Sequence, residues 1–283
     1  MQIVKTARAL RKQISQWRLH GLTIAFVPTM GNLHAGHLSL VKKAQQLADK
    51  VVVSIFVNPL QFNDQSDLSA YPRTLKADTE QLIESQCDLL FTPNQQSIYP
   101  EGMDAQTKVF VPNMDDKLCG LHRQGHFDGV ATIVLKLLNL VQADVAVFGE
   151  KDYQQLLLIK KMVTDLNLAV EIVGAPTCRE PNGLAMSSRN QYLTDQQSHV
   201  AGELYTTMLS IVEQLVNGNK DFSLLCEQAK DRLMHFGFQP EYVDIRRDDD
   251  LELAISDDKE IRIFIAARLG QARLIDNLAC NLA

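Results

Sequence analysis

The apolar, largely β-branched run at residues 51–57 (VVVSIFV) constrains the fold more than any other stretch of the sequence. Strands with one wet face alternate apolar and polar residues, whereas an unbroken run is typical of a strand that is buried on both faces of a parallel sheet. A second apolar run at residues 22–27 precedes it, and the helical pattern of residues 38–47 lies between the two. This order predicts a β-α-β unit and therefore an α/β fold.

A second unit of the same kind is predicted from a strand at residues 144–148, a helix at about 154–166 and a strand at 169–173. We also expect a helix from Ile3 to Trp17, helices at 74–85 and 129–141, and a short strand at 88–91. Residues 94–124 have weak periodicity and many turn residues, which favours an insertion over the sheet with one candidate strand at 108–111.

The composition changes after Pro176, where residues 179–190 are polar and contain glycine, as in a hinge. Helices are expected at 195–216 and 222–236. Three strands with alternating apolar and polar residues follow at 242–246, 260–266 and 272–276, which is typical of a small antiparallel sheet. The prediction is a Rossmann-like, doubly wound parallel sheet in residues 1–176 and a smaller α+β domain in residues 177–283.

The overall composition excludes several classes of function. The formal charge of −6 and the isoelectric point near 5.6 argue against a general binder of nucleic acids or anionic membranes, which would usually be basic. No apolar run has the length of a membrane span, and the N-terminus lacks the apolar core of a signal peptide. We therefore expect a cytoplasmic protein without nucleic-acid or membrane partners. The five cysteines are scattered without a CxxC pair, which indicates reduced thiols.

The first candidate site lies between the strand at 22–27 and its helix, where the sequence reads Met30-Gly31-Asn32-Leu33-His34-Ala35-Gly36-His37. A helix start offers unpaired N–H groups and the positive end of the helix dipole, and open α/β sheets bind ligands at this edge. The three-residue spacing places His34 and His37 on one face of the helix. They could bind phosphate, bind a metal or act as general acids; the structural alternative is that they only cap the helix.

Three further groups of polar residues suit a nucleotide or a small acid. Gly149-Glu150-Lys151-Asp152 follows the strand at 144–148; here Lys151 could be a surface lysine, and Asp152 could cap a helix or bind a ribose hydroxyl. Met186-Ser187-Ser188-Arg189 offers hydroxyls and a guanidinium to phosphate oxygens. The amides of Asn58, Gln61 and Gln155 could fix polar groups of a ligand, although Gln61 alone could be an exposed loop residue.

These motifs together carry a resemblance. Residues 30–37 resemble the HIGH motif of the adenylyl-transferring superfamily, and Met186-Ser187-Ser188-Arg189 resembles its KMSKS motif with arginine in place of a lysine. More closely, the segments at 27–37, 54–62, 71–74, 148–155 and 186–193 resemble, in order and over almost the whole chain, the pantothenate synthetase family.

The resemblance implies an ATP-dependent condensation of pantoate with β-alanine through pantoyl adenylate, which releases pyrophosphate and then AMP. It implies His37 as general acid and His34 as phosphate partner. The residues themselves agree with this chemistry, because Lys151, Arg189, the two histidines and the helix N–H groups can stabilise the charge that develops during adenylation. Gln61 would contact pantoate and β-alanine, and Gln155 would contact pantoate. The implied ATP-binding residues are Met30, Gly31, Asn32, Leu33, His34, Ala35, Gly36, His37, Gly149, Glu150, Lys151, Asp152, Cys178, Met186, Ser187, Ser188 and Arg189.

The resemblance also implies magnesium, a homodimer and a C-terminal domain that closes as a lid. Asp78 would be the magnesium ligand, but Ala77 stands where the family often has a second acidic residue. Gln124 stands where the family more often has a proline. The run at 51–57 is our candidate for the dimer surface. Two competing functions stay open, a nucleotidylyltransferase and an inactive nucleotide sensor. The acidic charge and the small C-terminal part argue against a tRNA synthetase.

Overall fold

The computed structural model describes residues 1–63 and 65–282. The chain divides into two compact units. The first contains residues 1–150 and 158–176, and the second contains residues 151–157 and the chain from Thr177 onward. The assignment of residues 1–176 to ATP and pantoate binding, and of residues 177–283 to a lid, stays a prediction.

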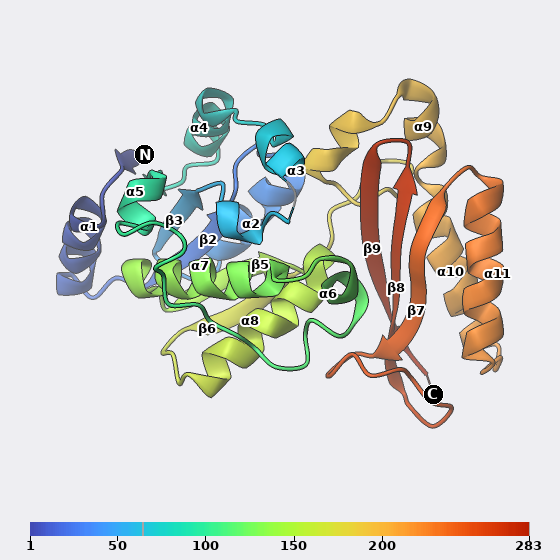
Figure 1. Ribbon diagram of the computed structural model, residues 1–283. Coiled ribbons are helices and arrows are strands. Elements are labelled where there is room, and N and C mark those ends of the chain that lie inside the picture. Colours follow the sequence, from blue (N-terminus) through green and yellow to red (C-terminus); the bar gives the residue numbers. More distant parts are fainter. Residues whose placement is uncertain (64, 283) are drawn as a thin grey trace. The chain divides into compact units, whose positions relative to one another are not determined.

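The first unit contains a parallel sheet of six strands (Figure 1). The strands are β1 (Gln2–Val4), β2 (Ile24–Thr29), β3 (Lys50–Ile55), β4 (Leu89–Phe91), β5 (Val145–Gly149) and β6 (Glu171–Ala175), in the order β1-β4-β3-β2-β5-β6. Strand order reverses between β2 and β5, which is the topological switch point where doubly wound folds bind ligands. The predicted Rossmann-like sheet is confirmed.

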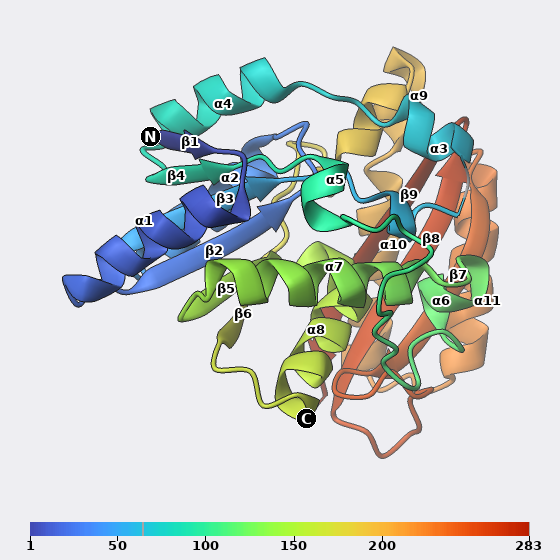
Figure 2. The same ribbon diagram turned by 60° about the vertical axis from the view of Figure 1, so that its left-hand side comes forward.

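Apolar side chains on both faces hold this sheet. Val27 and Val53 face a core that includes Val41 of α2 (Ala35–Gln45) and Leu82 of α4 (Leu75–Glu84). The intervening residues, such as Phe26, are also fully buried and face the other way. On that other face lie α1 (Ala7–Leu19) and α7 (His126–Val141), which contact each other (Figure 2). The shorter helices of the unit are η1 (Pro59–Gln61), α3 (Gln65–Ala70), α5 (Gln95–Ile98) and α6 (Leu118–His122).

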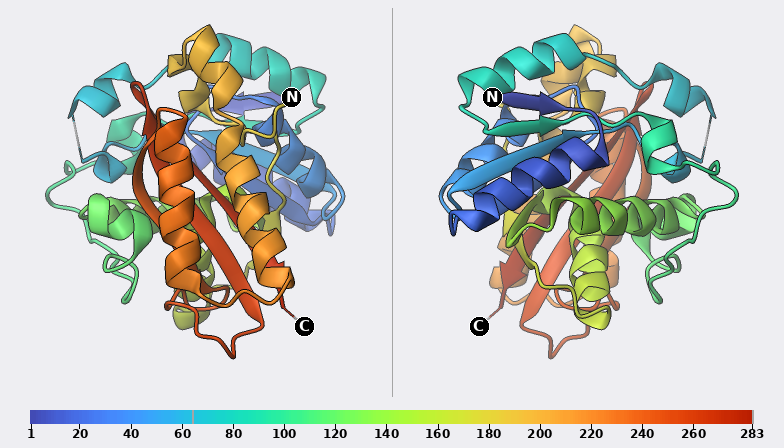
Figure 3. Two further views of the ribbon diagram at one scale, coloured as in Figure 1. Left: turned by 90° about the vertical axis from the view of Figure 1, so that its right-hand side faces the viewer. Right: turned by 90° about the vertical axis from the view of Figure 1, so that its left-hand side faces the viewer.

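The second unit contains an antiparallel sheet of three strands, β7 (Gln239–Arg247), β8 (Glu260–Leu269) and β9 (Ala272–Asn281). The helices α10 (Glu203–Val216) and α11 (Phe222–His235) lie side by side against one face of it (Figure 3). Their buried residues, Ile211 and Leu233 among them, form one core with Ile263 and Ile265 of β8. The predicted smaller α+β part is therefore present.

Four local predictions are wrong. Residues 2–4 form β1, which pairs with β4, and the first helix begins only after Thr6, whose hydroxyl accepts the Ala9 N–H. Residues 108–111 are not a strand. The expected helix at 195–216 is two helices, α9 (Asp195–Val200) and α10, with a turn at Ala201 and Gly202 between them. Residues 51–55 belong to β3, an interior strand, and are therefore no exposed surface for a dimer.

The remaining helices join the two units along the chain. η2 (Glu150–Asp152) runs directly into α8 (Tyr153–Asp165), and η3 (Ser188–Tyr192) follows the polar stretch after Pro176. None of the helices in residues 1–63 and 65–282 combines the length and the apolarity that a membrane crossing requires. All five cysteines are free thiols, and burial raises the pKa of Cys87 and of Cys226 to about 11, which suits inert thiols.

Gly129 tests the close packing of α7 on η1. A Cβ at this position would lie 2.3 Å from the Leu60 carbonyl oxygen and 2.8 Å from the Gln61 Cα. We expect Gly129→Ala to lower the free energy of unfolding by about 1–3 kcal/mol, because the two backbones must separate. Gly149→Ala is the control for urea denaturation, since its Cβ meets no atom within 4 Å. Equal unfolding midpoints for the two variants would contradict this account.

Candidate active site

The turn after β2 is built around the carboxylate of Asp78. Gly31 has φ +84° and Asn32 has φ +51°, so the chain reverses through two left-handed residues. Asp78 accepts hydrogen bonds from the backbone N–H of Asn32 (3.1 Å) and of Leu33 (2.8 Å), and from the Thr74 hydroxyl (3.1 Å). A Cβ on Gly31 would approach Asp78 Oδ2 to 3.0 Å, so glycine allows the carboxylate to seat here.

These contacts give Asp78 a structural role. Its two oxygens accept three hydrogen bonds and the residue is 1% exposed, so it does not fit the prediction of a magnesium ligand. Within residues 1–63 and 65–282, no group of three His, Cys, Asp or Glu side chains could hold a metal. The same hydrogen bonds engage the backbone N–H groups of Asn32 and Leu33. From the sequence alone, N–H groups of this turn are candidates for binding phosphate.

His34 and His37 cap α2 reciprocally. His34 Nδ1 accepts the N–H of Gly36 (3.1 Å), and His37 Nδ1 accepts the N–H of His34 (3.4 Å). The two rings are 4.1 Å apart between centroids. This is a capping box made of two histidines in place of the usual Ser or Thr with Glu or Gln. Both histidines therefore cap the helix, each through Nδ1, and the caps do not involve Nε2 of either ring.

The caps fix the tautomer of both rings. A backbone N–H can only donate, so Nδ1 of each ring carries a lone pair, and the proton of a neutral ring sits on Nε2. Each of the two adjacent side chains therefore has its N–H at Nε2. Such donors suit phosphate oxygens. The His34 side chain already takes the N–H of Gly36 in the first turn of α2, so this helix N-terminus offers fewer unpaired donors to a phosphate than the sequence suggested.

Gln61 is oriented by buried partners rather than exposed on a loop. It is 9% exposed, and its Oε1 accepts a hydrogen bond from Asn58 Nδ2 (3.1 Å). Asn58 in turn accepts the Tyr99 hydroxyl proton (2.7 Å) and donates to the Gly129 carbonyl (3.1 Å). The Gln61 Nε2 group lies 3.1 Å from the sulfur of Met30. Residues predicted for the acid substrate and for ATP thus lie in contact within the first unit.

Two polar neighbours of Gln61, His126 and Arg123, were missed from the sequence. His126 Nδ1 lies 2.7 Å from the Gln61 carbonyl oxygen, and its Nε2 lies 2.9 Å from the Arg123 guanidinium. Because the carbonyl only accepts and the guanidinium only donates, this ring is neutral with its proton on Nδ1. A histidine next to the glycine that begins a helix was the only available signal. At Gln124, where the family more often has proline, the carbonyl accepts a hydrogen bond from the Asn63 amide.

The segment after β5 divides between the two units. Gly149 ends β5, the strand that neighbours β2, and Glu150 follows it, so they and the Met30 turn share the switch point of the sheet. Lys151 and Asp152 are counted with the second unit. The Lys151 side chain is 17% exposed, with its ammonium 3.8 Å from the Asp152 carboxylate, which contradicts the alternative of a solvated surface lysine. Asp152 is the last residue of η2 and directly precedes Tyr153, the first residue of α8.

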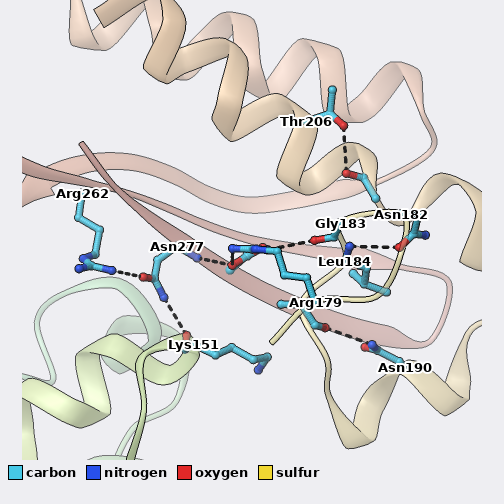
Figure 4. A network of polar contacts seen from close by, with 12 residues as sticks. Lys151, Arg179, Asn182, Gly183, Leu184, Asn190, Thr206, Arg262 and Asn277 are labelled. Atoms are coloured by element: carbon cyan, nitrogen blue, oxygen red, sulfur yellow. Dashed lines mark hydrogen bonds and ion pairs between the residues drawn. The ribbon is translucent and has the colours of Figure 1, made fainter. Parts of the chain in front are cut away.

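The second unit gathers the remaining predicted residues. The Met186 N–H donates to the Cys178 carbonyl oxygen (2.9 Å), so the backbones of these two candidates meet. Ser187 is the N-cap of η3, where its hydroxyl accepts the N–H of Arg189 (3.2 Å), and the Asn190 amide donates to the Ala185 carbonyl. Gln155 lies on the first turn of α8, half-buried. The predicted residues thus form two groups, one in each unit, and Figure 4 shows polar contacts of the second.

Asp78 gives a test that separates a structural role from metal binding. We expect Asp78→Asn to lower the free energy of unfolding by about 1–3 kcal/mol without magnesium or ATP, because an NH₂ group would face a donor. Glu80→Gln, at an exposed position on the same helix, is the matched control for thermal unfolding. A metal ligand would behave in the opposite way. Metal-free Asp78→Asn would unfold like the wild type, and excess magnesium would restore its activity.

Comparisons with known proteins identify the family of this chain. The family model for pantoate-beta-alanine ligase matches residues 2–279. The pantothenate synthetase of Pseudomonas aeruginosa (strain UCBPP-PA14) is 53% identical over 282 residues, which span 100% of each chain. The crystal structure of pantothenate synthetase from Thermus thermophilus matches with a TM-score of 0.92 and 41% identity, over 98% of this chain and 99% of that one.

A second solved structure carries ligands. The pantoate-beta-alanine ligase from Francisella tularensis, crystallised with beta-gamma ATP and beta-alanine, matches with a TM-score of 0.83 and 36% identity, over 98% of this chain and 97% of that one. The family model and these relatives cover the whole length over which the site residues are distributed. This chain therefore belongs to the pantoate-beta-alanine ligase family.

Proposed function

We propose that the two groups of residues described above carry out the reaction of this family. The chain is a ligase that condenses pantoate with β-alanine, consumes ATP and forms pantoyl adenylate on the way. The observation that best supports the site is the contact of Gln61 with Met30. An amide donor that neighbouring side chains hold in place lies beside the turn that carries the two histidine donors.

In the first step a carboxylate oxygen of pantoate attacks the α-phosphorus of ATP, and the bond to pyrophosphate breaks. Negative charge grows on the phosphoryl oxygens and on the leaving group. The Nε2–H groups of His34 and His37, the Lys151 ammonium and the Arg189 guanidinium are the proposed donors that stabilise it. In the second step the amine of β-alanine attacks the acyl carbon, AMP leaves, and the amine gives up a proton.

The tautomer changes the role that the resemblance implied for His37. A neutral ring that gave away its Nε2 proton would become an imidazolate, and protonation of Nδ1 would break the bond to the His34 N–H. We therefore propose His37 as a hydrogen-bond donor rather than a general acid. Pyrophosphate is a good leaving group and does not need a proton before it departs.

A hydrogen bond to a neighbouring residue also determines which group of the Gln61 amide can bind substrate. Asn58 holds its oxygen, so the NH₂ group is the end that can donate to pantoate and β-alanine, both of which carry a carboxylate. Gln155 is proposed as the second contact to pantoate. The nucleotide would be held by Met30 to His37, Gly149 to Asp152, the Cys178 backbone and Met186 to Arg189.

Three finer points belong to the same proposal. Magnesium would be held by the phosphates of ATP and by water, since Asp78 is engaged with the turn after β2. Closure of the second unit as a lid would protect the adenylate from water. The homodimer and the cytoplasmic location stay predictions from the sequence, with pantoate, β-alanine and ATP as the small-molecule partners.

A product assay tests the proposed function against its competitors. We expect the purified chain, given ATP and magnesium, to form AMP and pantothenate in equal amounts only when pantoate and β-alanine are both present. With pantoate alone, pyrophosphate release should stop near one equivalent per site, because the adenylate stays bound. A product that keeps the nucleotide would support a nucleotidylyltransferase. ATP binding without turnover would support an inactive sensor.

The role of His37 has its own test. Gln can place an N–H close to the position of Nε2 but cannot transfer a proton at neutral pH. Since a hydrogen bond to a charged group contributes about 1.5–3 kcal/mol, we expect adenylation by His37→Gln to be at least about tenfold faster than by His37→Ala. His235→Gln, at an exposed position on α11, should match the wild type in pyrophosphate release. Equal loss in both His37 variants would instead indicate proton transfer.

A further inference from the structure

Asn277 on β9 makes two hydrogen bonds whose partners determine how its amide is oriented. Its Oδ1 accepts from the Arg262 guanidinium (2.6 Å), and its Nδ2 donates to the backbone carbonyl of Lys151 (2.9 Å) (Figure 4). The guanidinium can only donate and the carbonyl can only accept. Asn277 is 4% exposed, so water cannot easily replace either partner. Aspartate at this position would lack the donor.

Arg262 also contacts Tyr153, which lies in the same turn as Lys151. Its Nε donates to Asp248 (2.5 Å), and its guanidinium lies 3.6 Å from the centroid of the Tyr153 ring. The Tyr153 hydroxyl donates to the other oxygen of Asp248 (2.7 Å). The Lys151–Tyr153 turn is therefore fixed at two points two residues apart, the carbonyl of Lys151 and the side chain of Tyr153. Both points depend on β8 and β9.

The neighbouring residue on β9 holds the other phosphate-binding segment. Asp276 is 3% exposed and forms a bidentate ion pair with Arg179, at 2.5 and 3.0 Å. Burial raises the pKa of the Asp276 carboxyl, and Arg179 opposes that shift. Arg179 also donates to the Gly183 carbonyl (3.0 Å) and stacks on the Tyr205 ring at 3.7 Å. Because Arg179 follows Cys178, this ion pair anchors the start of the 178–189 loop.

We infer that Asn277 is a positioning residue for adenylation, which acts by fixing the backbone of Lys151, while Asp276 fixes the 178–189 loop from the adjacent position. Two consecutive residues of β9 thus hold the Lys151 turn and the 178–189 loop at adjacent positions within the second unit. Buried polar groups that only filled space could be replaced by apolar ones at little cost in stability. Here the Asn277 NH₂ group and the Asp276 carboxylate are each paired with a segment to which the proposed function, on which this inference rests, assigns ATP phosphates.

The test combines Asn277→Asp with Lys151→Ala in a double-mutant cycle. Asn277→Asp is nearly isosteric, keeps the acceptor for Arg262 and removes the donor to Lys151. Because small displacements of a reacting group can lower rates about 100-fold, we expect pantoate-dependent pyrophosphate release to fall about 10- to 100-fold in a single turnover with enzyme in excess. In the Lys151→Ala background the same substitution should lower the rate by less than about twofold, since the group that it positions is absent.

A control and the contrary outcomes complete the design. Asn281→Asp adds the same charge at an exposed position on the same strand and should leave the rate and the thermal midpoint unchanged. A purely structural role would lower the rate by the same factor in both backgrounds, and that result, or a wild-type rate in Asn277→Asp, overturns the inference alone. A wild-type chain that forms no adenylate overturns the proposed function as well.

Discussion

The site depends on how the chain satisfies the N–H groups between β2 and α2. A strand that turns directly into a helix leaves several donors unpaired, and these would attract any available acceptor. Here Asp78 takes the N–H groups of Asn32 and Leu33, and His34 takes that of Gly36. Because protein side chains satisfy the turn, its shape does not depend on a bound nucleotide. The donors proposed for the nucleotide are then imidazole N–H groups whose direction is fixed by the same hydrogen bonds.

The same principle recurs around the other functional groups. The Gln61 amide is oriented by Asn58, and its carbonyl is held by His126. The Lys151 carbonyl is held by Asn277. In each case a side chain proposed to touch substrate is carried by a backbone or amide that a buried polar neighbour fixes. Positioning of this kind reduces the entropy that the reacting groups must lose in the transition state, which suits a reaction without a covalent enzyme intermediate.

The sequence predicted the parallel sheet because an unbroken apolar run such as residues 51–57 is typical of a strand that is buried on both faces of a parallel sheet. It also located both segments at the switch point, since each follows a buried strand. It could not predict that His34 and His37 bond to the backbone through Nδ1, because spacing alone treats both ring nitrogens alike. β1 was missed because three residues carry no periodicity, and its stability comes from pairing with β4. The roles of Asp78, Tyr99 and Asn277 were hidden because Leu33, Asn58 and Lys151, to which they bond, lie 41 to 126 residues away from them.

The central claim is that His34 and His37 are neutral rings with the proton on Nε2, held there by caps at Nδ1. Nitrogen-15 NMR of histidine-labelled protein at neutral pH measures this directly, with the two rings assigned from His34→Gln and His37→Gln samples. We predict for both rings an Nδ1 signal typical of an unprotonated nitrogen and an Nε2 signal typical of a protonated one. An Nδ1–H tautomer, or a doubly protonated ring, at either residue would contradict the account.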